Sequence, residues 1–84
     1  MTDIPRSNID HLGIFVPADK FESTVEWYLA ALAPLKYKKI MEFPGTVGLG
    51  SQIPDFWVAI KDGPAPQNVH FAFSAPGAYP PLRL

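Results

Sequence analysis

Apolar and polar residues along the chain form short runs that predict one helix among several strands. Residues 9–16 are almost all apolar and rich in β-branched side chains, which predicts a strand that stops at Pro17. Residues 19–32 predict a helix, with Asp19 as its N-cap and Glu22 three positions later. The stripe that this helix would bury has the spacing of one helix face and consists of Phe21, Val25, Tyr28, Leu29 and Leu32.

Four more apolar runs follow the helix and predict further strands. They cover residues 37–43, 46–50, 55–60 and 69–74. Pro34 ends the helix, and Pro44-Gly45 predicts a turn between the first two of these strands. The expected order is β-α-β-β-β with one more strand after it. Strands and a single helix without regular alternation are typical of the α+β class.

Two histidines occupy matching positions in two of the predicted strands. His11 lies in the segment IDHLGIF and His70 in the segment NVHFAFS, and the chain has no other histidine. Residues two apart in a strand share a face, so each imidazole would lie beside a small residue, Gly13 or Ala72. This repeated pattern indicates the start of one structural unit at His11 and the start of a second unit at His70. Since few residues follow His70, we expect the second unit to be incomplete in this chain.

Composition narrows the classes of function. The 84 residues are 48% hydrophobic, which is enough for one small domain with a core and too apolar for disorder. A formal net charge of −1 without a basic stripe argues against nucleic acid as a partner. No apolar run approaches the roughly 20 residues of a membrane span. The chain has no cysteine, so any metal would need imidazole, carboxylate or backbone ligands, and we expect a soluble, cytoplasmic protein.

Several stretches together resemble a known superfamily. They are the opening strand 9–16, the helix segment STVEWY with Leu32 and Leu35, the pair VGLG and DFWV, and the later VHFAF. In this order they are similar to the vicinal oxygen chelate superfamily, which includes glyoxalase I, bleomycin-resistance and extradiol dioxygenase-like proteins. The resemblance covers roughly residues 8 to 75.

This resemblance implies a βαβββ module with a curled, mixed sheet and one packing helix. Residues 8–62 would form this module, and residues 63–84 would be a linker, the opening strand of an incomplete second module and an irregular tail. Two such modules enclose a cavity in that superfamily. We therefore expect either a homodimer that completes the cavity or a shortened form of a longer, two-module protein.

The resemblance also implies a site and three alternative functions. His11 and His70 would hold a divalent metal, Zn, Ni, Mn or Fe, for lyase, isomerase or dioxygenase chemistry on a small molecule with vicinal oxygens. The strand 55–60 has Phe56, Trp57, Val58 and Ala59 where a metalloenzyme of the glyoxalase type would place a carboxylate, so only Asp55 at its start, or Glu42, could complete the shell. Alternatively, a metal-free protein of the resistance type would hold its ligand with aromatic residues, for which the candidates are Phe15, Phe56 and Trp57. The third alternative is a dimerising fragment without activity.

Overall fold

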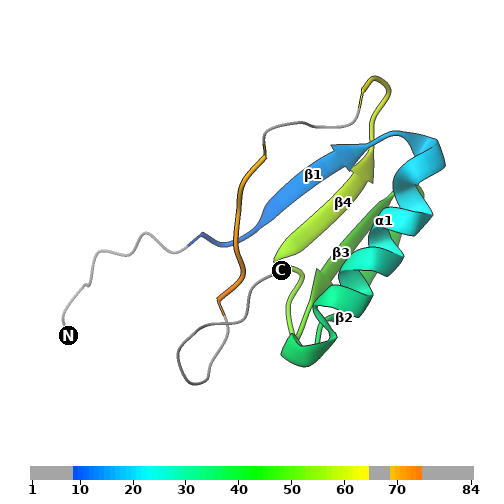
Figure 1. The fold of residues 1–84 in the computed structure, drawn as a ribbon. Helices are drawn as coiled ribbons and strands as arrows, with labels where there is room; N and C mark the ends of the chain where they lie inside the picture. The colour runs from blue at the N-terminus through cyan, green and yellow to red at the C-terminus, as the bar shows by residue number, and fades with distance from the viewer. Residues whose placement is uncertain (1–8, 65–68, 75–84) are drawn as a thin grey trace, which may run out of the picture.

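One helix and a four-stranded sheet make up the part of the chain that the computed structural model describes, residues 9–64 and 69–74 (Figure 1). The elements are β1 (Leu12–Val16), α1 (Ala18–Ala31), the 3-10 turn η1 (Ala33–Leu35), β2 (Lys38–Phe43), β3 (Thr46–Gly50) and β4 (Phe56–Ile60). The strand order is β1-β4-β3-β2, with β1 parallel to β4 and the other neighbours antiparallel. The predicted α+β class and βαβββ order are confirmed, in a mixed and open sheet.

The helix begins one residue earlier than the sequence predicts. Pro17 occupies the N-cap position in an extended conformation, and no side chain caps the first turn. The predicted N-cap role of Asp19 is therefore wrong, because the proline fixes the chain direction two residues before it. Asp19 instead lies in the first turn, where a carboxylate is stabilised by the positive end of the helix dipole.

The core lies between α1 and the face of the sheet that the helix covers. From the sheet it receives Val16, Val47, Leu49, Phe56 and Val58, and from the helix Val25. The predicted stripe on the helix is confirmed, since Leu32 is also buried and Phe21, Tyr28 and Leu29 pack against this cluster. Leu49, Phe56 and Val58 have no exposed surface, so the middle of the sheet is sealed on this side.

Close contacts fix the connections around β3. The predicted turn at Pro44-Gly45 joins β2 to β3, and Gly45 has a φ of +74° that favours glycine. The carbonyl of Gly45 also accepts a 2.8 Å hydrogen bond from the backbone N–H of Ile60 in β4. At the other end of β3, a side chain on Gly50 would overlap the backbone carbonyl of Ile53, so the loop to β4 requires glycine there.

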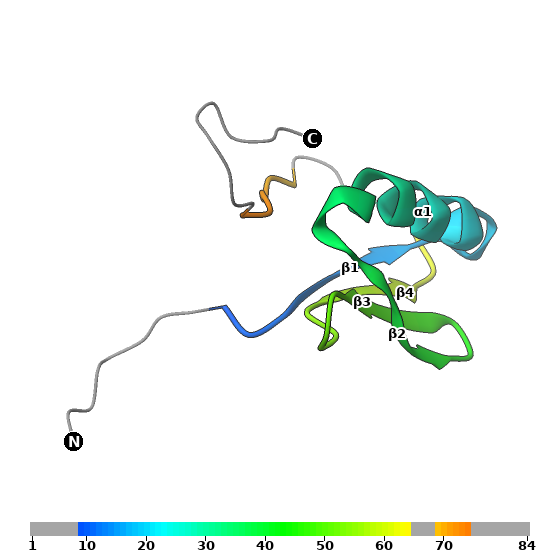
Figure 2. The ribbon, with the colours of Figure 1, turned by 90° about the horizontal axis from the view of Figure 1, so that it is seen from below.

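The segment 69–74 does not form the strand that the sequence predicts. It runs beside β1 on the side of the sheet that carries α1 (Figures 1 and 2). Phe71 and Phe73 point into the core and contact Phe56 at ring-centroid distances of 5.6 and 5.4 Å, whereas His70 and Ala72 are exposed. The predicted alternation of faces thus holds without strand pairing, because aromatic packing rather than a hydrogen-bonded ladder positions the segment.

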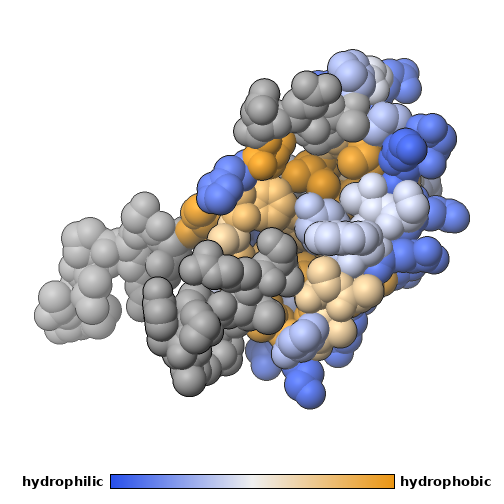
Figure 3. All heavy atoms as spheres, viewed as in Figure 1, coloured by the Kyte–Doolittle hydropathy of each residue, from blue (hydrophilic) through white to orange (hydrophobic). Residues whose placement is uncertain are grey.

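The outer surface on the helix side is mixed in character. Figure 3 shows hydrophilic residues along the border formed by α1 and hydrophobic ones gathered nearer to β1. Among the residues that the structure describes, no helix has the length and apolar character needed to cross a membrane.

Candidate functional site

The face of the sheet opposite α1 is apolar, and within the described residues no helix or further strand covers it, although Pro54 lies against it beside Gly48. Directly paired residues share a face, so the strand register sorts its side chains into two rows. The first row is Gly13, Trp57, Gly48 and Met41, and the second row is Phe15, Ala59, Thr46 and Phe43. These eight residues are called the open face below.

Trp57 forms a fixed ledge on the open face. A methyl group built on Gly48 would lie 2.9 Å from Cη2 and Cζ3 of the Trp57 ring and 2.8 Å from Cβ of Pro54. The six-membered ring of the indole therefore lies over Gly48, in space that only glycine leaves free. On the other side, Gly13 places no side chain against the Trp57 backbone. Trp57 is thus held in one orientation while it remains partly exposed.

The second row has large side chains at its two ends and small ones between them, an arrangement that is called the trough below. Phe15 and Phe43 lie at its two ends and are each 54% exposed. Between them lie the small side chains of Ala59 and Thr46. Three strand spacings separate the two phenylalanines, which is roughly 14 Å at about 4.8 Å per spacing. A flat ring system fits such a floor, with Trp57 along one side.

His11 lies beyond the first row, at the start of β1. Its Nδ1 is 2.9 Å from Oδ2 of Asp10, and the pair is largely exposed. The backbone N–H of Leu12 donates to the carbonyl of Asp55 at 3.0 Å, which places His11 and Asp55 at the same end of the sheet. Both residues line a hollow of about 350 Å³ together with Tyr37 and Phe73.

The carboxylate of Asp55 accepts hydrogen bonds from Tyr37 inside this hollow. The hydroxyl of Tyr37 donates to its carboxylate at 2.8 and 3.0 Å from the two oxygens. Burial, the hydrogen bond to Asp55 and the negative charge of Asp55 raise the pKa of Tyr37 to about 12. Tyr37 therefore stays neutral at physiological pH and holds Asp55 in one orientation.

The predicted site residues divide between opposite sides of the sheet. Phe15 and Trp57 lie together on the open face, whereas His11 precedes β1 and lines the hollow at the end of the sheet with Tyr37 and Phe73. Phe56 does not join them, because it points under α1 and has no exposed surface. The prediction of Phe56 as a ligand contact must be corrected, since adjacent residues in a strand face opposite ways. His70 is exposed on the segment beside β1 and is not among the residues that line the hollow around His11.

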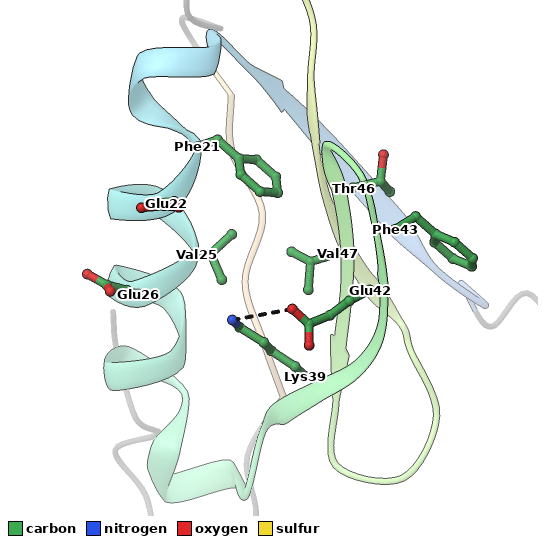
Figure 4. Close-up of a pocket in the computed structure, with 9 residues that line it drawn as sticks. All are labelled: Phe21, Glu22, Val25, Glu26, Lys39, Glu42, Phe43, Thr46 and Val47. Carbon is green, nitrogen blue, oxygen red and sulfur yellow. Dashed lines mark ion pairs between the residues drawn. The ribbon is translucent and has the colours of Figure 1, made fainter.

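Glu42, the other carboxylate considered as a metal ligand, lies on the helix side. An irregularity in the register between Lys39 and Met41 places Lys39 and Glu42 on one face, and their charged groups pair at 3.5 Å. This pair lies in a groove between α1 and β2, which Val25 and Val47 also line (Figure 4). Phe43 and Thr46 of the open face border this groove, whereas His11 is not among the residues that line it.

The described residues do not form a metal site on their own. Within residues 9–64 and 69–74, no group of three or more His, Asp or Glu side chains lies close enough to hold a metal ion. Catalytic metal sites generally use three protein ligands. Nδ1 of His11 contacts Asp10, so its free donor is Nε2, and one chain offers a single imidazole at this position.

Comparison with known proteins leaves the superfamily resemblance as an expectation from sequence. No protein-family model matches the chain, and a search of curated proteins finds no match either.

The sequence predicted only Phe15 and Trp57 among the eight residues of the open face as site residues. Met41, Phe43, Thr46 and Ala59 become part of the site only through the register of β2, β3 and β4. One signal was available, because the two-residue turn at Pro44-Gly45 places Phe43 opposite Thr46. The remaining pairs depend on how β4 inserts between β1 and β3, which local patterns do not encode.

Proposed function

We propose that the protein binds a small, planar and largely apolar molecule on its open face. The observation that supports this most directly is the trough of Ala59 and Thr46 between Phe15 and Phe43, with Trp57 as a rigid ledge. Aromatic side chains contribute both buried area and stacking, and stacking alone is worth about 0.5–1.5 kcal/mol per pair. Such a function is that of a metal-free binding protein of the resistance type.

An open sheet face covers only one side of a ligand. Binding sites for small molecules generally bury about 70–90% of the ligand surface. We therefore propose that two copies of the chain bring their open faces together and enclose the ligand between them. Phe15, Met41 and Phe43 are all more than 40% exposed, and contact with a partner copy would bury them. We also propose a cytoplasmic location, because a sequence without cysteine gives no sign of a disulfide-stabilised secreted fold.

A second candidate function is metal-dependent chemistry on a molecule with vicinal oxygens. The contact between Asp10 and Nδ1 of His11 favours it, since metal-binding histidines commonly give their second nitrogen to a carboxylate. A homodimer would supply two such imidazoles, and the metal would act as a Lewis acid. Zn, Ni, Mn and Fe all suit imidazole ligands. Native mass spectrometry with each metal tests this candidate, and uptake that His11→Ala does not reduce would contradict it.

The binding proposal is tested by NMR titration with 2-naphthamide, a neutral planar molecule. The expected result is a saturable shift of the Trp57 indole N–H resonance. Trp27 provides a control within the same spectrum, because it lies exposed on α1 and its resonance should stay in place. Equal small shifts of both tryptophans, or none, would contradict the proposal. Mass measurement of the same sample, with and without 2-naphthamide, determines whether a dimer forms.

A further inference from the structure

Lys61 lies at one end of the trough and gives the open face a positive charge. It follows the last residue of β4, and alternation places it on the same face as Ala59. Its Nζ lies 5.1 Å from the centroid of the Phe15 ring, within the range of a cation–π contact. The backbone N–H of Lys61 donates to the carbonyl of Val16 at 2.9 Å, which anchors the residue to β1.

The ammonium of Lys61 is not neutralised within the described residues. The ion pairs formed there are His11 with Asp10 and Lys39 with Glu42, and no carboxylate of these described residues lies within 4 Å of the Lys61 ammonium. Lys61, Asp62 and Phe15 line one hollow at the edge of β1. The carboxylate of Asp62 lies more than 4 Å from the ammonium of Lys61, so the two do not form an ion pair. The two rows of the open face contain no charged residue at all. Within residues 9–64 and 69–74, Lys61 therefore presents an exposed ammonium that is in no ion pair.

We infer that the ligand of the open face is an aromatic acid, whose ring lies in the trough and whose carboxylate meets Lys61. This inference rests on the proposed function and specifies the class of ligand. A ring over Ala59 and against Phe15 directs a substituent at its edge toward the ammonium. Hydrogen bonds between an ammonium and a carboxylate are stronger than neutral ones, and the flanking aromatic surface lowers the local dielectric. The cation–π contact with Phe15 holds Lys61 in place before the ligand arrives.

The test compares two ligands of the same shape, 2-naphthoate and 2-naphthamide. Their dissociation constants are measured from the Trp57 indole N–H shift at low salt. Wild type should bind the acid about tenfold more tightly than the amide, in line with a partly exposed charged hydrogen bond. In Lys61→Gln this preference should disappear, mainly because the acid binds more weakly. Lys61 is exposed, so we expect the variant to fold.

A control variant distinguishes a direct contact between Lys61 and the ligand from a general effect of the protein's net charge. Lys38 pairs with Gly50 at the opposite end of the sheet, and Lys38→Gln removes the same charge. This variant should retain the preference for the acid. Equal affinity of wild type for acid and amide, or a preference that survives Lys61→Gln, would overturn the inference and leave the proposed function standing. If neither ligand shifts the Trp57 resonance, both fail.

Discussion

The two faces of the sheet carry similar kinds of residue but lie in opposite surroundings. Under α1, Phe56 and Val58 have no exposed surface, whereas Phe15 and Phe43 on the open face are more than half exposed. The same short strand, β4, supplies Phe56 to one side and Trp57 to the other. An apolar side chain on a strand of this protein therefore lies either in the core under α1 or on the exposed open face. The predictions below distinguish these two roles.

The largest expected difference in folding stability is between alanine variants of two phenylalanines, one in the core and one on the open face. Phe56→Ala should destabilise the fold by about 3–5 kcal/mol, because it leaves a cavity under α1. Phe15→Ala should cost less than about 1 kcal/mol, since most of its ring is already in water. Urea denaturation of both variants measures the difference. If Phe56→Ala does not fold at all, Leu49→Ala serves instead with about 2–5 kcal/mol. Similar losses for the two faces would contradict the contrast.

The next effect concerns the ledge formed by Trp57. Gly48→Ala should cost about 1–3 kcal/mol, because the new methyl group would meet the indole and Pro54 at less than 3 Å. Gly13→Ala should cost less, since its methyl group would lie 3.3 Å from Cβ and the carbonyl oxygen of Trp57. Thermal unfolding gives the stabilities, and the Trp57 indole resonance reports the displaced ring. A Gly48→Ala variant as stable as wild type with an unmoved resonance would show that the indole lies elsewhere.

A smaller effect is expected from Tyr37 and depends on pH. Tyr37→Phe removes the hydrogen bond to Asp55 and should cost about 1 kcal/mol at neutral pH. The folded state raises the pKa of Tyr37 above its ordinary value of 10, so it binds the proton more tightly than the unfolded chain does. This contribution is complete below pH 10 and is lost as the pH rises toward 12. The stability gap between wild type and variant should therefore narrow over that interval in urea denaturation. A gap that stays constant up to pH 12 would argue against the raised pKa.

The smallest effect on stability is expected at His11. His11→Ala should change the free energy of unfolding by less than about 0.5 kcal/mol, because the imidazole and its Asp10 partner are largely exposed. Circular dichroism during thermal unfolding is sufficient to measure this. A loss above about 1 kcal/mol would indicate that His11 has a structural role in the hollow beside Asp55.

Element order was predictable from sequence because each strand and the helix carry a local signal. The bounds predicted for β3 agree with the structure, and β2 and β4 each begin one residue later than predicted. β1 begins three residues later, at Leu12, because the parallel ladder with β4 starts there. Apolar runs mark where strands lie, whereas their ends depend on the neighbouring strand.

The face of each residue in β4 could not be predicted. The run FWVAI is apolar throughout, so it carries no alternation that would separate Phe56 from Trp57. Two tertiary features determine which face each side chain of β4 occupies. β1 pairs in register with β4, and Gly48 leaves room for the indole of Trp57. The matching positions of the two histidines were also insufficient to predict a strand at His70. The segment around His70 packs through Phe71 and Phe73 instead of forming a strand.

An isotope-filtered NOE experiment on the chain with bound 2-naphthoate tests the central claim most directly. It identifies which protein protons lie close to the ligand. We predict contacts to the methyl group of Ala59 and to the rings of Trp57 and Phe15, all on the open face. Contacts to Phe21 and Val25 in the groove beside α1, without any to Trp57, would contradict the account.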